Sequence, residues 1–81
     1  MEMRLLRGDE MALFYTRDLD SAFPAAELKP LRAMEAARQT GKYHPWGLFD
    51  GEDLVGGAFT WEYAPGWVLF DYLCVARHRR N

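Results

Sequence analysis

A single carboxylate stands near the middle of the most apolar stretch of the chain. Residues 67–75 read Trp-Val-Leu-Phe-Asp-Tyr-Leu-Cys-Val, and Asp71 is the only charged side chain among them. Burying a charge is costly unless the group is paired or put to use. A carboxylate in such a position can accept a proton directly or through water, which is the work of a general base. The alternative is structural, with Asp71 satisfying backbone amides or pairing with an arginine.

Other reactive side chains offer weaker candidates. His44 and His78 lie far apart in the chain and show no Cys-His spacing, so no metal site is expected. Cys74 is the only thiol and, on a buried strand, is expected to be an inert small hydrophobe. No serine lies in a nucleophile-elbow context. A basic cluster at residues 77–80 follows the apolar run, and its place favours a phosphate-facing loop over a nucleic-acid patch.

The segment that carries Asp71 is predicted to be a strand at 66–75. β-Branched and aromatic residues run through it almost without a break, and a Pro-Gly turn precedes it. Because polar residues do not alternate with apolar ones, both faces of this strand are predicted to be buried. A period of two predicts further strands at 44–49 and 53–63, joined by a hairpin turn at 50–53. The three strands are expected to form an antiparallel meander.

The first half of the chain is predicted to supply a short strand and two helices. Residues 2–7 favour a strand, and apolar side chains at helical spacing predict a helix over roughly 9–19. Pro24 and the residues before it end that helix. A second helix is predicted at 30–40, with a proline at its start and a glycine after its end. The predicted fold class is therefore α+β: a strand, two helices and a three-strand antiparallel meander.

This order of elements and the last residues of the chain resemble the first half of the GNAT superfamily of acyl-CoA N-acyltransferases. In that family an apolar central strand ends in a Leu-x-Val-like triplet, and a basic loop then opens the signature Arg/Gln-x-x-Gly-x-Gly/Ala. Leu73-Cys74-Val75 match the triplet, Arg80 stands where the signature begins, and Asn81 would be its second residue. Residues 1–81 are therefore expected to form the N-terminal part of a single GNAT domain, an incomplete GNAT fold with the glycines still to come.

The resemblance implies an activity and the residues that serve it. The activity is transfer of an acetyl group from acetyl-CoA to an amine, with Asp71 as the catalytic base that faces the acceptor amine. The backbone of Leu73, Cys74 and Val75 is expected to bind the pantetheine arm and the acyl carbonyl, and Arg80 the phosphates. The residues expected at the acceptor pocket are Phe23, Glu27, Tyr43, Trp61 and Glu62.

Length and composition limit the classes of fold, partner and location that the chain can have. Eighty-one residues make one domain at most, and 49% hydrophobic with 27% charged residues argues against disorder. A net charge of −2 gives no reason to expect a nucleic-acid partner. One cysteine, no apolar leader and no membrane-length run make the cytoplasm the expected location and a membrane partner unexpected.

Two functions remain open on the sequence alone. The chain by itself is expected to be inactive, because the amides that bind the CoA pyrophosphate would lie after Arg80. Its central strand would then have an unpaired edge, which favours a homodimer or association through that edge. The alternative is a non-catalytic α+β module that dimerises or docks a partner chain. Reading the genomic sequence past Asn81, for Gly-x-Gly followed by a helix, separates the two.

Overall fold

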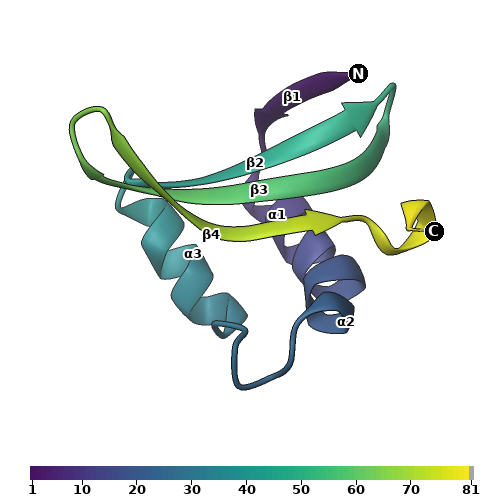
Figure 1. Cartoon of the computed structure of the whole chain (residues 1–81), viewed down its shortest axis with the longest axis horizontal. Coiled ribbons are helices and arrows are strands. Elements are labelled where there is room, and N and C mark those ends of the chain that lie inside the picture. The colour runs from purple at the N-terminus through teal and green to yellow at the C-terminus, as the bar shows by residue number, and fades with distance from the viewer. Residues whose placement is uncertain (81) are drawn as a thin grey trace.

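The computed structural model describes residues 1–80 and confirms the α+β class (Figure 1). In chain order the regular elements are β1 (Glu2–Leu5), α1 (Gly8–Phe14), a π-helical turn (Tyr15–Leu19), α2 (Asp20–Ala22), α3 (Leu31–Gln39), β2 (Tyr43–Asp50), β3 (Asp53–Ala64), β4 (Trp67–Val75) and a 3₁₀ turn (Arg77–Arg79). The three strands of the predicted meander and the second helix lie within one or two residues of their predicted bounds.

The four strands form one antiparallel sheet in the order β1-β2-β3-β4. The first strand thus joins the meander by pairing with β2, where Met3 lies opposite Leu48. Two glycines shape the hairpin turns, because Gly51 has φ +62° and Gly66 has φ +80°, values that residues with a Cβ rarely adopt. The Pro-Gly turn predicted before the last strand is therefore confirmed.

The first helix is less regular than its apolar stripe predicts. The helical run ends at Ala22 rather than at residue 19, and its middle widens into the π-helical turn. Leu19 keeps its inward position and is fully buried, as are Phe14 and Met11, about one and two turns earlier. The wider turn therefore preserves the predicted apolar face while changing the pitch of the backbone.

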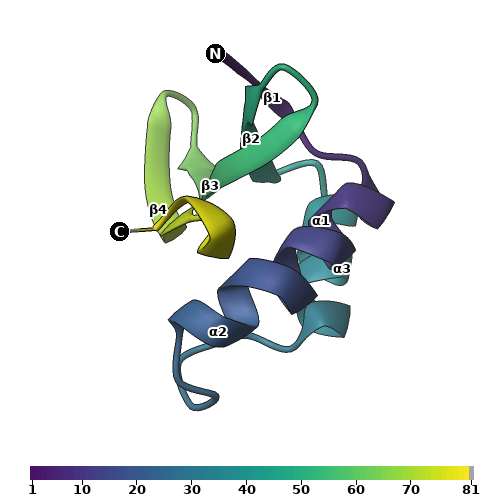
Figure 2. The same cartoon turned by 90° about the vertical axis from the view of Figure 1, so that its right-hand side faces the viewer.

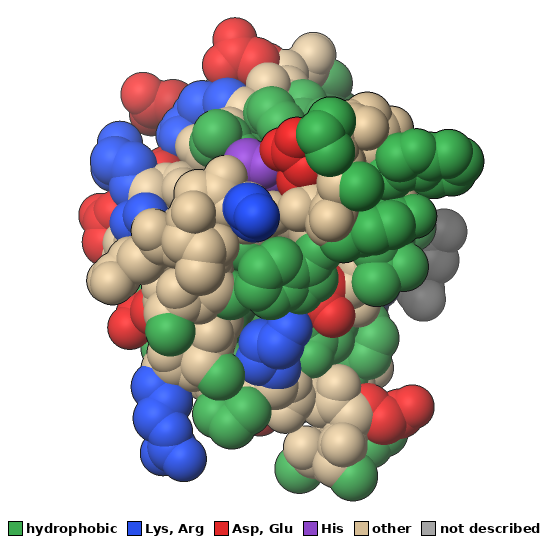
Figure 3. All heavy atoms as spheres, turned by 90° about the vertical axis from the view of Figure 1, so that its left-hand side faces the viewer, with side chains coloured by type: hydrophobic (Ala, Val, Ile, Leu, Met, Phe, Trp, Pro, Cys, Tyr) green, Lys and Arg blue, Asp and Glu red, His purple; other side chains and the backbone are tan. Residues whose placement is uncertain are grey.

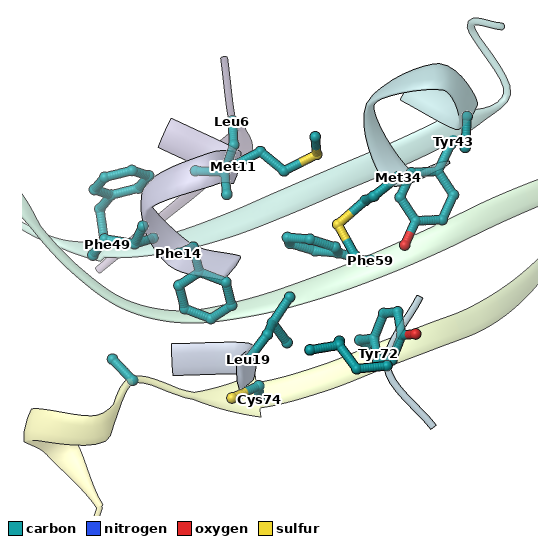
Figure 4. Packing of buried hydrophobic residues seen from close by; sticks show 14 residues of the cluster. Leu6, Met11, Phe14, Leu19, Met34, Tyr43, Phe49, Phe59, Tyr72 and Cys74 are labelled. Carbon is teal, nitrogen blue, oxygen red and sulfur yellow. The ribbon is translucent and has the colours of Figure 1, made fainter. Parts of the chain in front are cut away.

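The helices α1, α2 and α3 lie on one face of the sheet (Figure 2), and the buried hydrophobic residues lie between the two layers. Side chains from both layers meet there, among them Met11, Phe14, Leu19, Met34, Tyr43, Phe59 and Tyr72 (Figure 4). Phe14 approaches the sheet closely because β3 has no side chain at Gly57. A Cβ at that position would lie 2.8 Å from the Phe14 ring.

The opposite face of the sheet is not covered by any element among residues 1–80, and this corrects one prediction. The last strand was expected to be buried on both faces, but only its helix-facing side chains, such as Tyr72 and Cys74, are buried. Leu73 and Val75, which alternate with them, are 72% and 53% exposed. The unbroken apolar run reflects residue type and not two-sided burial. Seen from the end with the β3–β4 turn, hydrophobic side chains gather along one side of the molecule (Figure 3).

Candidate functional site

Asp71 occupies an irregular position in β4. Phe59 on β3 lies opposite Tyr72, and the next residue, Thr60, lies opposite Phe70, so Asp71 is an extra residue on its strand. Such a β-bulge twists the strand locally and redirects the side chain of the extra residue. The Asp71 carboxylate accordingly contacts groups on the helix-bearing side, next to the buried Tyr72.

The Asp71 carboxylate has two close partners, and both reach the same oxygen. The Lys29 ammonium lies 2.6 Å from Oδ2, and the Tyr43 hydroxyl donates to Oδ2 at 2.7 Å. The side chains of Lys29 and Asp71 are 25% and 23% exposed, so the pair is shielded but still open to solvent on one side. Burial, together with the bond to Asp71, raises the pKa of Tyr43, which keeps its hydroxyl protonated and able to donate.

Three aromatic rings surround the Lys29 ammonium. Its nitrogen lies 5.1 Å from the ring centroid of Tyr43, 5.5 Å from that of Trp61 and 5.9 Å from that of Tyr72. Each distance falls within the range over which a ring face attracts a cation. We call these three rings and the Asp71 carboxylate the ammonium cage. Tyr43 and Tyr72 lie at the same end of the core in Figure 4.

Lys29 reaches the cage from the irregular segment 23–30 between α2 and α3. Its backbone amide donates to the Tyr72 hydroxyl at 2.7 Å, and its carbonyl accepts from the Tyr15 hydroxyl at 2.8 Å. The Tyr72 hydroxyl in turn donates to the carbonyl of Glu27 at 3.1 Å. Two tyrosine hydroxyls thus fasten this segment to the rest of the fold next to the cage.

The structure brings some predicted acceptor-pocket residues together. Tyr43 and Trp61 belong to the cage, and their rings contact each other at a centroid distance of 4.8 Å. Phe23 packs edge-on against Tyr72, with ring centroids 5.2 Å apart, and so borders the cage.

The two glutamates predicted for the pocket are placed differently. Glu27 contributes only its backbone carbonyl to the surroundings of the cage, and the residue is exposed to solvent. Glu62 lies on the uncovered face of the sheet, where its carboxylate is 3.5 Å from His44. Because neighbouring strand residues point to opposite faces, Glu62 points away from the side of its neighbour Trp61.

An open hollow of about 590 Å³ adjoins the residues predicted to bind the cofactor. Leu73, Cys74 and Val75 line it on β4, and residues 55–58 line it on β3. Its lining is largely apolar, which suits a hydrophobic arm better than a phosphate. Cys74 itself is buried, and its thiol lies 3.4 Å from a guanidinium nitrogen of Arg80.

Two of the basic residues after β4, Arg79 and Arg80, are engaged within the chain. Arg80 donates to the carbonyl of Val75 at 2.8 Å and to that of Asp18 at 3.1 Å. Arg79 pairs with Asp50 and Asp53, each at 3.0 Å. A phosphate at this turn would have to compete with these partners. Asn81, the expected second residue of the signature, lies outside the described residues.

Sequence reasoning missed two members of the site. Lys29 lies in a stretch without periodicity, so no local pattern marks it. Tyr72 reads as one more apolar residue of its strand, although a tyrosine beside a lone carboxylate is a signal that could have been used. Between residues 1 and 80, no group of histidine, cysteine, aspartate and glutamate side chains is arranged to hold a metal ion.

Comparison with known proteins adds no identification: no family model, no curated protein and no solved structure matches the chain. Within residues 1–80, every helix is too short or too polar to cross a membrane.

Proposed function

We propose that this chain carries the acceptor-amine site of a GNAT-type N-acetyltransferase, which moves an acetyl group from acetyl-CoA to an amine. The observation that carries the proposal is the amine nitrogen of Lys29, which lies 2.6 Å from the Asp71 carboxylate. The site therefore has the size and polarity to bind an amine next to Asp71, the residue expected to remove its proton. The order of a strand, two helices and an antiparallel meander is a second support.

In the proposed reaction Asp71 takes one proton from the acceptor ammonium. The neutral amine then attacks the thioester carbonyl, a C–N bond forms, and the C–S bond breaks to release the CoA thiolate. The second proton of the attacking nitrogen passes to that thiolate, which leaves a neutral amide and the CoA thiol. The Tyr43 hydroxyl, which donates to Asp71 at 2.7 Å, fixes the orientation of the carboxylate. A backbone amide of β4 would stabilise the oxyanion, as the family resemblance implies.

The residues beside the hollow fit only part of acetyl-CoA. The apolar lining around Leu73 and Val75 suits the pantetheine arm, which would have to pass around β4, the edge strand of the sheet, to bring its thioester to Asp71 on the helix-bearing side. Arg79 and Arg80 already have partners in the chain and would leave them to bind a phosphate. The lone free thiol, Cys74, agrees with the reducing cytoplasm as the proposed location.

The test is Asp71→Asn in the protein that contains residues 1–81. Acetyl transfer to a panel of amines is expected to slow by about 10²–10⁴-fold, the usual size of a general-base contribution. Glu62→Gln is the matched control, because it removes a carboxylate from the neighbouring strand on the other face, and its turnover is expected to be unchanged. Thermal unfolding of each variant is measured in parallel. Activity that falls only in proportion to the folded fraction would assign Asp71 to structure.

A second candidate function follows from the uncovered face of the sheet. Here the chain is a non-catalytic module that associates with a second copy of itself. The exposed apolar side chains of β1 and β4 and the unpaired edge of β4 favour this function. An antiparallel edge is self-complementary about a two-fold axis, so two copies can extend one sheet.

A further inference from the structure

The ammonium cage contains more recognition groups than a simple ion pair needs. A carboxylate alone can hold a lysine, yet three aromatic rings also face the Lys29 nitrogen at 5.1–5.9 Å. Rings arranged around a cation are a recurrent means of recognising alkylammonium ligands. The cage therefore has the composition of a binding site, and a side chain of the same molecule fills it.

The occupant is attached to an irregular part of the chain. Pro24 and residues 25–27 are exposed, and no helix or strand runs between Phe23 and Pro30. At the cage this segment is fastened by bonds of the Tyr15 and Tyr72 hydroxyls to backbone groups. Turning the Lys29 side chain outward would break its contacts with Asp71 and the three rings, and it would leave the backbone bonds of the segment and the strands that carry the cage in place.

We propose that Lys29 is a tethered occupant of a site for primary alkylammonium ions, and that an external amine of this class displaces it from Asp71. The Lys29 side chain is itself a butylammonium group, so the filled cage shows the shape of ligand that fits. The inference rests on the proposed function, for which it names the acceptor class: an unbranched primary amine such as a lysine side chain. Binding involves no bond formation and needs no acetyl-CoA.

Tethering determines how the site responds to an external amine. Because the ammonium is tethered by the lysine side chain, it competes at an effective concentration in the millimolar range or above. An external amine therefore binds the native chain weakly and binds tightly only when Lys29 is out of the cage. Removing the Lys29 side chain is expected to raise the affinity for a simple alkylamine by about tenfold or more.

The experiment is chemical rescue of Lys29→Ala by butylammonium chloride. Without a cation beside Asp71, the variant is expected to melt several degrees below the native chain. Butylammonium at ten times its dissociation constant should raise the melting temperature by roughly 5–10 °C, because a ligand that binds only the folded state stabilises it. Sodium chloride and butanol at the same concentrations should not.

Two variants and one spectroscopic signal make the result specific. Lys29→Met keeps the length of the side chain without its charge, and it is expected to respond less than Lys29→Ala because its stem fills the cage. Lys42→Ala removes an exposed lysine elsewhere and should show no rescue by butylammonium. The indole N–H resonance of Trp61, assigned with Trp61→Phe, should shift on titration of Lys29→Ala.

Equal responses of Lys29→Ala and Lys42→Ala, or an unmoved Trp61 resonance, would overturn the inference. A Lys29→Ala chain that stays unfolded at every amine concentration would also overturn it. Because no acetyl-CoA is present, the outcome is independent of catalysis. Rescue of Lys29→Ala by butylammonium, together with no acetyl transfer by the native protein, would support the amine site and refute the proposed acetyltransferase activity.

Discussion

At the scale of single residues, Glu10 connects the first helix to the first strand. Its carboxylate accepts two bonds from the Arg4 guanidinium, at 2.7 and 2.9 Å, and one from the backbone amide of Arg7 at 2.8 Å. The bond to Arg7 closes the N-terminus of α1 in the manner of a capping box. These bonds, with Arg4 the larger contributor, lower the pKa of Glu10 from 4.5 to about 2.

Glu10→Gln is expected to lower the free energy of unfolding at pH 7 by about 1 kcal/mol, after allowance for solvent screening. The folded chain holds this carboxylate ionised at lower pH than the unfolded chain does. The contribution is therefore complete above pH 4.5 and is lost as the pH falls through about 2. Urea unfolding of the native chain and of Glu10→Gln from pH 7 to pH 2 measures this contribution. The two free energies of unfolding should converge at the acid end.

Asp9→Asn supplies the control for this prediction. Asp9 is the exposed neighbour of Glu10 and makes one bond of 3.3 Å to Arg7. Its substitution should change stability by less than about 0.5 kcal/mol at any pH in the range. A Glu10→Gln difference that stays constant down to pH 2 would contradict the assigned cause.

At the scale of elements, a buried carboxylate joins the helical layer to the turn after β4. Asp18 lies in the π-helical turn and is fully buried. Its Oδ1 accepts the backbone amide of Arg77 at 2.7 Å, and its Oδ2 accepts from Arg17 at 2.7 Å. Arg17 in turn donates to the carbonyl of Leu54 on β3. One carboxylate thus fixes the 3₁₀ turn against both the helix and the sheet.

Asp18→Ala is expected to destabilise the chain by about 2–4 kcal/mol. The change leaves the Arg77 amide and the partly buried Arg17 guanidinium without their acceptor, and both are costly to leave unpaired. Asp20→Ala, two residues on and exposed, is the matched control and should change stability little. Thermal and urea unfolding of the two variants compare them. Equal losses would show that Asp18 does not hold the two elements together.

At the scale of the whole molecule, one broad apolar face is open to solvent. Phe70 and Leu73 on β4 are 66% and 72% exposed, and Met3 on β1 is 56% exposed. Apolar surface of this kind, beside an unpaired strand edge, favours association between copies. Within the helices of residues 1–80, Leu13 is the one large apolar side chain that is exposed, so association is expected through the open face of the sheet.

The chain is therefore expected to sediment faster as its concentration rises. Phe70→Lys with Leu73→Lys should keep it monomeric, because two charges would have to be buried on association. Gln39→Lys adds one such charge on α3, away from this face, and should leave association unchanged. Unfolding of the double variant should stay near the native value, since both side chains are exposed. A native chain that is monomeric at all concentrations would refute this prediction and the second candidate function.

The sequence by itself determined the regular elements and the residue at the centre of the site. Period-two patterns and turn glycines are local signals that determine the local backbone geometry. The bounds of the meander and its turns could therefore be predicted. Asp71 also stood out locally, as the one charge in an apolar run. Its ion-pair partner could not be predicted in the same way, because Lys29 is 42 residues away in the chain. Tyr43, 28 residues away, was expected near it from the family resemblance and not from a local pattern.

Only the tertiary structure decided which groups meet and which face is covered. The bulge that redirects Asp71 depends on the register between β3 and β4, which no single strand encodes. The open face of β4 depends on where the helices pack, since an apolar run looks the same whether or not a second layer lies over it. The cage exists because an irregular segment places a lysine over three rings from three strands, and side-chain contacts of that kind are set by packing rather than by local pattern.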